Sequence, residues 1–219
     1  YFRLPRKTPI SIFAIVVVAG VLYASLTNED NEMKPWQVAI PGIFFLLSIG
    51  FGEEMVSRGF VYGVLKHRSN KAAIFISSLF FGLMHLNLYT GRDWDPWLAY
   101  WHVASAFCFG YFMCALLIAT QSIWVPMLAH ALFDWGVVFD KTPPDLKDIP
   151  PISLPFWEGL VSPFGDFLFI FTPGALIFFF MKRRRIWFPR WFKALVIRIA
   201  IRWKLVEEST DKPELVGQY

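Results

Sequence analysis

Three ionisable side chains, Glu53, Glu54 and Arg58, stand at the end of an apolar run. An Asp, Lys or Arg at the centre of a spanning helix costs roughly 2.5–3.5 kcal/mol, so ionisable groups inside membranes are usually paired, turned inward and functional. On a helix, Glu54 and Arg58 are i,i+4 neighbours, and Glu53 lies about 100° round from Glu54. Arg58 can therefore neutralise one carboxylate and leave the other to do chemistry. An ordinary Glu–Arg pair at a membrane interface, with a second solvated Glu, has the same sequence.

Two further motifs, each with a functional residue in an apolar segment, favour chemistry. Phe81 and His85 form one pair, His130 and Asp134 the other, and each pair spans one helical turn inside or near the end of its own apolar segment. A lone histidine in a membrane helix is commonly a hydrogen-bond partner of a neighbouring helix. Three segments with polar groups at one-turn spacing all need partners where water is absent. Convergence of the three on one polar cavity is the simpler explanation.

The composition is that of a polytopic membrane protein. Of 219 residues, 56% are hydrophobic, with 24 Phe and 10 Trp, and the mean hydropathy is +0.46. The chain begins with Tyr1 rather than Met, so we expect it to be trimmed, and an upstream segment or signal stays open. Cys108 and Cys114 lie in one apolar run and are interpreted as small core residues, not as a disulfide framework or a metal pair.

We predict an all-α fold, a polytopic helical bundle of about six transmembrane helices. Most are 17–23 residues long, about what a ~30 Å hydrocarbon core requires. The expected spans are 10–27, 36–52 with a polar helical continuation to about 66, 72–89, 97–119, 122–139 and 164–181. Residues 1–185 would form the transmembrane domain, and 186–219 an interfacial helix and polar tail.

The distribution of basic residues predicts the orientation. If the spans alternate, ten Lys and Arg fall on one side and four on the other, which places both termini in the cytoplasm by the positive-inside rule. The ten are Arg3, Arg6, Lys7, Lys66, Arg68, Lys71, Lys182, Arg183, Arg184 and Arg185; the four are Lys34, Arg92, Lys141 and Lys147. Residues 186–205 interleave aromatic and aliphatic with basic side chains, which indicates a basic amphipathic helix on an anionic leaflet rather than a nucleic-acid site.

The expected spans do not bring the polar residues to one depth. Glu53 falls near the cytoplasmic end of its span, His85 near the opposite end, and His130 between them. One shared site therefore requires tilted helices, a kink around Gly50 and Gly52, or different helix limits.

If these residues do line one cavity, they could hydrolyse an amide inside the membrane. A carboxylate in a dry cavity can act as general base on a water held beside a neutral imidazole, and a second histidine can stabilise an oxyanion. The chain lacks a G-x-S-x-G elbow and an H-E-x-x-H motif. A metal site made from Glu53, His85 and His130 stays open, because two His and one carboxylate suit zinc with one free position.

The three motifs resemble those of the CPBP intramembrane proteases, the CAAX-protease and bacteriocin-processing group. The resemblance covers residues 40–140 and rests on Glu53-Glu54-x-x-x-Arg58, Phe81-x-x-x-His85 and His130-x-x-x-Asp134, in this order on separate apolar segments. It implies an all-helical membrane fold with the active site in a cavity inside the bilayer.

The resemblance also implies roles for these residues. Glu53 and His85 would activate water, Glu54 and Arg58 would support the site, and His130 with Asp134 would stabilise the oxyanion. The last motif more often ends in Asn in the CAAX endopeptidases. An ionised Asp134 cannot donate a hydrogen bond, although it can orient His130 or bind a metal. Both a metal-dependent and a glutamic mechanism are compatible with the family, and we favour the mechanism without a metal or other cofactor.

The leading hypothesis is an intramembrane endopeptidase that cleaves a membrane-associated protein or peptide in the lipid bilayer. Prenylated C-termini, leader peptides and C-terminal sorting tails are all open as substrates. The short loops favour a prokaryotic cell-membrane enzyme, and hence leaders or tails. Two other hypotheses remain: a non-catalytic immunity or binding protein of the same fold, and a proton- or cation-coupled transporter.

Three other polar residues receive structural interpretations. We expect His102 to be an interfacial or packing histidine and His67 to be solvated in a basic turn. Asn87, two residues after His85, could line the mouth of the cavity.

Overall fold

The computed structural model describes residues 2–5, 8–27, 34–89, 95–141 and 153–183, and these contain helices and turns without a single strand ladder. The helices are named in the order in which they occur along the chain. The helices are α1 (Pro9–Thr27), α2 (Trp36–Glu54), the π-helix η1 (Met55–Tyr62), α3 (Gly63–Leu65), α4 (Asn70–Met84), the 3-10 helix η2 (His85–Tyr89), α5 (Pro96–Thr120), α6 (Trp124–Phe133), α7 (Trp135–Phe139), α8 (Phe156–Val161) and α9 (Phe164–Arg183).

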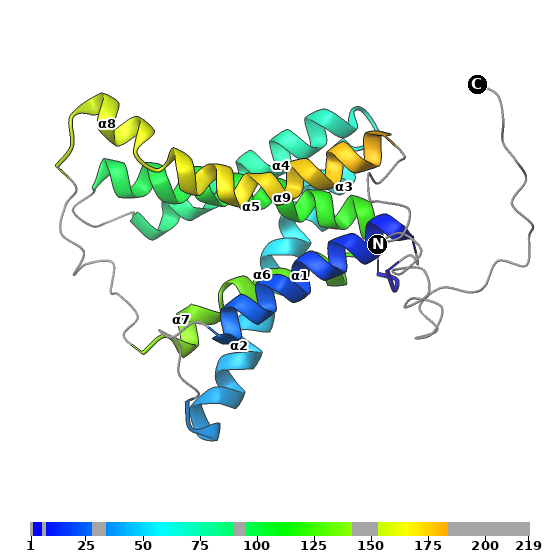
Figure 1. Cartoon of the computed structure of the whole chain (residues 1–219), viewed down its shortest axis with the longest axis horizontal. Coiled ribbons are helices and arrows are strands. Elements are labelled where there is room, and N and C mark those ends of the chain that lie inside the picture. The colour runs from blue at the N-terminus through cyan, green and yellow to red at the C-terminus, as the bar shows by residue number, and fades with distance from the viewer. Residues whose placement is uncertain (1, 6–7, 28–33, 90–94, 142–152, 184–219) are drawn as a thin grey trace, which may run out of the picture.

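Helix α5 is the centre of the fold. It packs side by side with α4 and α9, and α1, α2 and α6 lie across this layer at a steep angle (Figure 1). Asp95 starts α5, because its carboxylate accepts hydrogen bonds from the amides of Trp97 (2.9 Å) and Leu98 (3.3 Å). The helix ends at Gln121, which adopts a left-handed conformation with φ 57°. The main hydrophobic core runs along α5, where Met113, Leu116 and the α9 residue Ile177 are fully buried.

Two glycines let the helices that carry the polar motifs approach closely. A Cβ on Gly50 of α2 would lie 2.6 Å from the carbonyl oxygen of Met127 in α6, and a Cβ on Gly82 of α4 would lie 2.7 Å from the carbonyl oxygen of Val103 in α5. Small residues at such crossings are a common way to bring membrane helices together, because backbones can then touch. The first crossing joins α2 to α6, and the second joins α4 to α5.

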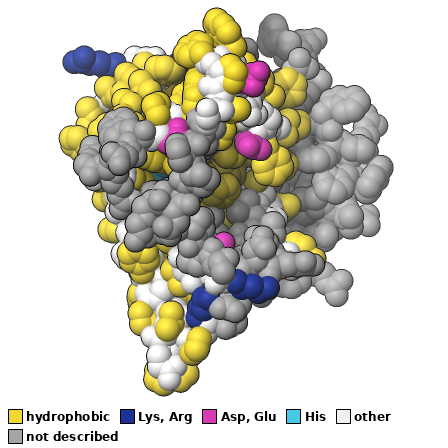
Figure 2. Space-filling model, turned by 90° about the vertical axis from the view of Figure 1, so that its left-hand side faces the viewer, with side chains coloured by type: hydrophobic (Ala, Val, Ile, Leu, Met, Phe, Trp, Pro, Cys, Tyr) yellow, Lys and Arg dark blue, Asp and Glu magenta, His cyan; other side chains and the backbone are white. Residues whose placement is uncertain are grey.

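The expected all-helical membrane fold is confirmed, but the count of six spanning helices is not. Within the described residues, four helices are long and apolar enough to cross a membrane: Trp36–Leu65, Asn70–Tyr89, Pro96–Thr120 and Phe156–Met181. The expected spans 10–27 and 122–139 correspond to the shorter apolar helices Pro9–Gly20 and Trp124–Phe139. Most of the described surface in Figure 2 is hydrophobic, as lipid contact requires.

The expected polar continuation of the second span is helical, as predicted, but much of it is not α-helix. Helix α2 ends at Glu54, and the chain continues as the π-helix η1 and then as α3. The predicted C-terminal amphipathic helix at 186–205 and the tail to 219 lie outside the described residues, as do Arg6, Lys7, Arg92, Lys147, Arg184 and Arg185.

Candidate active site

The core of the site is a buried ion pair between Glu54 and Arg58. Nη1 of Arg58 lies 3.0 Å from Oε1 of Glu54, and both side chains have 0% exposure. The two residues are one turn apart, as the sequence predicts, although the turn between them passes from α2 into η1. Removing a charge from water is expensive, so a pair buried this deeply requires further partners for both members.

Arg58 finds these partners on neighbouring helices. Its Nη2 donates a hydrogen bond to the carbonyl oxygen of Gly110 on α5 at 2.9 Å. The guanidinium carbon lies 4.5 Å from the centre of the Phe81 ring on α4, in a cation–π contact. Arg58 therefore ties η1 to both α4 and α5.

His130 on α6 is surrounded by carboxylates. Its Nδ1 lies 3.1 Å from Oε1 of Glu54, and its Nε2 lies 3.3 Å from Oδ2 of Asp134, one turn further on. Only the imidazolium form has a proton on both ring nitrogens to donate to the two carboxylates. The rings of Phe81 and Phe109 stand edge-on to the His130 ring, at centroid distances of 5.5 and 5.1 Å. Two predicted motifs thus meet at this histidine.

Glu53 faces the same histidine from α2. Its Oε2 lies 3.8 Å from Nε2 of His130, and its side chain is 32% exposed. Within the described part of the chain, Oε2 of Glu53, Oε2 of Glu54 and Nε of Arg58 are buried without a hydrogen-bond partner. Buried polar atoms are normally paired, often by ordered water. The carboxylate of Glu53 is thus available to a water molecule or a substrate.

His85 joins the site through a polar cavity of about 140 Å³. Its Nδ1 donates a hydrogen bond to the carbonyl oxygen of Phe81 at 2.9 Å, which leaves Nε2 as the acceptor nitrogen of a neutral ring. No hydrogen bond or ion pair joins His85 to Glu53 in the described structure. The cavity is lined by Phe81, His85, His102, Ser105, Ala106, Phe109, His130, Phe133, Asp134 and Ile170.

The π-helix η1 carries Arg58, the last residue of the first motif. It contains Ser57 and Arg58, both fully buried. Because a π-helix has wider turns than an α-helix, these residues take other positions around the helix axis than a continued α-helix would give them. The carbonyl oxygen of Ser57 accepts a hydrogen bond from the Ser77 hydroxyl of α4 at 2.7 Å. Gly50 and Gly52, where a kink was one of three ways to bring the motifs to one depth, both lie within α2, and the change from α- to π-helix starts at Met55.

His102 packs against neighbouring side chains, as expected, and one of these is the predicted site residue His85. This histidine lines the polar cavity, and its ring lies 4.8 Å from the His85 ring. Its Nδ1 is 2.9 Å from the hydroxyl oxygen of Tyr89, a buried residue. No motif spacing marks His102 in the sequence; the only signal is a histidine in an apolar helix. Asn87 is exposed and does not line the cavity, and His67 is exposed as expected.

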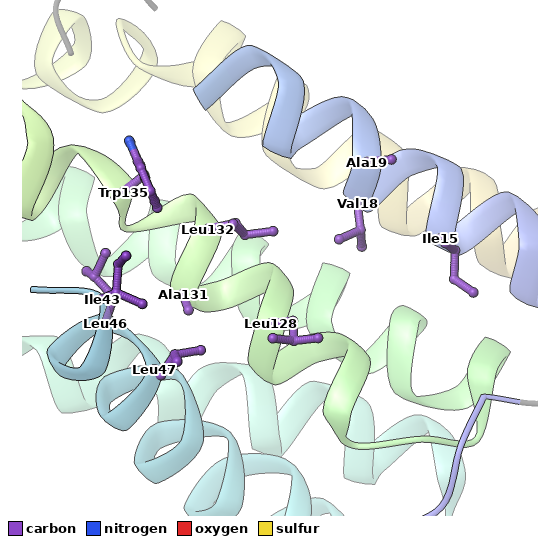
Figure 3. A pocket seen from close by; sticks show the side chains of 10 residues that line it. All are labelled: Ile15, Val18, Ala19, Ile43, Leu46, Leu47, Leu128, Ala131, Leu132 and Trp135. Carbon is purple, nitrogen blue, oxygen red and sulfur yellow. The ribbon is translucent and has the colours of Figure 1, made fainter. Parts of the chain in front are cut away.

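A second, larger pocket is apolar. It has a volume of about 320 Å³, lies between α1, α2 and α6, and is lined by apolar side chains and Trp135 (Figure 3). Leu128, Ala131 and Leu132 line it from α6, on a stripe that does not include His130 or Asp134. This pocket therefore supplies no acid, base or nucleophile.

The three candidate zinc ligands do not form a ligand set in this arrangement. Within residues 2–5, 8–27, 34–89, 95–141 and 153–183, no group of three or more His, Cys, Asp and Glu side chains could hold a metal ion. Both ring nitrogens of His130 face carboxylates, and Nδ1 of His85 faces a backbone carbonyl. Cys108 and Cys114 are buried, unpaired core residues, as predicted.

Comparison with known proteins identifies one family. The family model described as "Type II CAAX prenyl endopeptidase Rce1-like" matches residues 35–136. This segment runs from the start of α2 to α7 and contains all six predicted site residues. The resemblance to the CAAX-protease group is thereby confirmed. No curated protein and no solved structure matches the chain.

Proposed function

We propose that the protein hydrolyses a peptide bond of a membrane-associated substrate with a water activated by Glu53, and the match of residues 35–136 to the model of Rce1-like type II CAAX prenyl endopeptidases supports this. Four helices among the described residues are long and apolar enough to span a bilayer, which supports an integral membrane enzyme. The catalytic assignment of individual residues is our proposal.

One observation carries the assignment of Glu53. Its Oε2 is buried without a hydrogen-bond partner and faces Nε2 of His130 at 3.8 Å, while Glu54 is engaged by Arg58 and His130. Oε2 of Glu54 also lacks a partner, but the Glu54 side chain is fully buried whereas that of Glu53 is 32% exposed, so Glu53 is the carboxylate that we assign as the base. A general base must reach the proton that it abstracts within hydrogen-bond distance or through one water.

The proposed reaction begins with a water bound between Glu53 and His85. The water gives a proton to Oε2 of Glu53, and its oxygen forms a bond with the carbonyl carbon of the substrate. The carbonyl π-electrons move to the oxygen and produce a tetrahedral oxyanion. The carbonyl then reforms, the C–N bond breaks, and the proton held by Glu53 passes to the leaving amine.

Two histidines take different parts in this scheme. Because Nδ1 of His85 is occupied by the Phe81 carbonyl, Nε2 can accept the second hydrogen of the water and orient it. His130 contributes its positive charge to the oxyanion, since its Nε2 proton is directed to Asp134. Glu54 holds His130 from the other side and Arg58 neutralises Glu54.

We propose that this hydrolysis requires no metal. Of the three candidate ligands, His130 has both ring nitrogens directed to carboxylates, so neither nitrogen is free to coordinate an ion. Cleavage should therefore persist in the presence of a strong chelator.

Three classes of substrate are candidates. The family description names CAAX prenyl endopeptidases, which makes prenylated C-terminal peptides one class to test; leader peptides and C-terminal sorting tails are the others, favoured if the protein is prokaryotic.

We further propose that the end of the bundle carrying Arg3, Lys66 and Arg68 faces the cytoplasm. Arg3 donates to the carbonyl oxygen of Gln121 at 3.0 Å, so the N-terminal segment lies at the α5–α6 turn.

The experiment is cleavage of a panel of membrane-tethered peptides from these three classes by purified protein in nanodiscs. Glu53→Gln and His85→Ala should each abolish cleavage. Glu158→Gln, the same chemical change at an exposed position in α8, is the matched control and should leave cleavage unchanged, as should a chelator.

Loss of cleavage on chelation, restored by added metal, would overturn the metal-free scheme. Full activity of Glu53→Gln would overturn the assignment of the base. A cellular phenotype that survives Glu53→Gln, without cleavage of any peptide, would favour a binding protein. Ion flux into vesicles that depends on Glu53, again without cleavage, would favour a transporter.

A further inference from the structure

His85 stands where the backbone changes from one helix type to another. Helix α4 ends at Met84, and His85 is the first residue of the short 3-10 helix η2. Short 3-10 segments have poorer hydrogen-bond geometry than an α-helix and commonly mark hinges. The orientation of the His85 ring therefore needs support from outside its own helix.

His102 supplies a support of this kind from α5. Its ring stands at 61° to the His85 ring at a centroid distance of 4.8 Å, an edge-to-face contact. The Phe81 ring contacts the same imidazole at 4.9 Å. His85 is thus held by two aromatic rings and by the hydrogen bond to the Phe81 carbonyl.

Tyr89 fixes His102 in turn. Its hydroxyl oxygen lies 2.9 Å from Nδ1 of His102, and Tyr89 is only 5% exposed. Tyr89 is the last residue of η2 and His85 is the first, so His102 contacts both ends of this helix. Tyr89, His102 and His85 form a clamp that attaches η2 to α5; we use "the η2 clamp" for these three residues.

We propose that His102, held by the Tyr89 hydroxyl, is a positioning residue that keeps the His85 ring oriented with Nε2 toward the polar cavity. This inference rests on the proposed function for its effect on catalysis, but its structural part does not. His85 and His102 both line the cavity with His130 and Asp134, so a rotation of His85 would misplace the water acceptor without disturbing the Glu54–Arg58 pair.

Three substitutions test the η2 clamp. Tyr89→Phe removes one hydroxyl and keeps the ring. His102→Phe keeps a ring but removes both nitrogens, whereas His102→Asn keeps a polar group near the place of Nδ1. The matched control is Tyr100→Phe on α5, which removes a hydroxyl that donates to the carbonyl oxygen of Leu160 at 3.2 Å, outside the cavity.

Kinetics in nanodiscs give the first readout. Tyr89→Phe and His102→Phe should each lower kcat about tenfold, because a misplaced catalytic group costs rate, with KM within about twofold of wild type. The double variant should be no slower than either single variant, since both changes release the same ring. His102→Asn should restore most of the kcat that His102→Phe loses, and Tyr100→Phe should have the kcat of the wild type.

Nitrogen-15 NMR of the imidazoles gives a readout that needs no substrate. The chain has four histidines, so each signal can be assigned by single substitution. Wild-type protein should show His85 as one tautomer, protonated at Nδ1. Tyr89→Phe and His102→Phe should show a mixture of His85 tautomers, and Tyr100→Phe should not.

Unchanged His85 signals in both clamp variants would overturn the proposal. So would losses of kcat that multiply to about a hundredfold in the double variant, or losses confined to KM, which would make His102 a substrate contact. If the wild-type protein cleaves no peptide, the proposed endopeptidase function fails, while the NMR result still decides whether His102 positions His85.

Discussion

A single carboxylate oxygen joins the first and third motifs. Oε1 of Glu54 lies 3.0 Å from Nη1 of Arg58 and 3.1 Å from Nδ1 of His130. The first and third motifs therefore meet at one carboxylate oxygen, which Arg58 and His130 both contact. Loss of either partner removes a contact of a carboxylate that is fully buried.

We predict that Arg58→Ala lowers the free energy of unfolding by about 3–5 kcal/mol, the usual cost of breaking a buried ion pair by removing one partner. The variant leaves Glu54 with His130 as its remaining cation and also removes the hydrogen bond to the Gly110 carbonyl. Denaturant unfolding in detergent micelles measures the change.

Arg68→Ala is the control for this prediction, because Arg68 is exposed and its removal should change the free energy of unfolding by less than about 0.5 kcal/mol. An Arg58→Ala variant as stable as this control would mean that the pair is solvated in the membrane-bound protein.

At the scale of elements, the site depends on two close helix crossings. Gly50 lets α2 touch the backbone of α6, and Gly82 lets α4 touch the backbone of α5. The first crossing sets the approach of Glu53 and Glu54 to His130, and the second sets the approach of His85 to His102. A methyl group at either crossing must push two helices apart.

Gly50→Ala should lower the free energy of unfolding by about 1–3 kcal/mol, the usual cost of overpacking, and should reduce cleavage, because the added Cβ meets a backbone carbonyl at 2.6 Å. Thermal unfolding in micelles and the peptide assay measure the two effects.

The matched control lies two residues further along the same helix. No atom of a neighbouring residue lies within 4 Å of a Cβ built on Gly52, so Gly52→Ala should leave stability unchanged or raise it by up to about 1 kcal/mol. Equal behaviour of the two variants would show that α2 and α6 are not in contact at Gly50.

Much of this arrangement follows from the sequence, for identifiable reasons. The one-turn spacing of Glu54 with Arg58 and of His130 with Asp134 is local geometry, and both pairs form as predicted. The π-helix was not predictable, because its i+5 hydrogen bonds leave no periodic signal in an eight-residue segment. A packing role for His102 was expected, but its partners were not predictable, because Tyr89 and His85 lie on another helix, where spacing gives no information.

At the scale of the whole molecule, the interior and the lipid-facing surface are both apolar, so burial rather than polarity separates them. Phe169 of α9 is 81% exposed, whereas Phe81 and Phe112 are 1% and 2% exposed. The packing around α5 encloses both cysteines, with Cys114 at 0% and Cys108 at 9% exposure.

We predict that a membrane-impermeant maleimide labels neither Cys108 nor Cys114 in the folded protein and labels both after unfolding. The reason is that both thiols face the interior around α5. Mass spectrometry of the intact protein before and after denaturation counts the labels. An Arg68→Cys variant, with its thiol at an exposed position, is the positive control; labelling of a native cysteine in folded protein would contradict the packing of α5.

The sharing of Glu54 also has a consequence for biosynthesis. Arg58 follows Glu54 by one turn and is available to it as soon as the helix forms, but the Gly110 carbonyl is synthesised 52 residues after Arg58, and His130 comes 76 residues after Glu54. At roughly 5–20 residues per second, His130 emerges about 4–15 s later than Glu54. Until Phe81 and Gly110 are made, the pair has only itself to offset two charges, so a change at either residue would impair insertion before any active site exists.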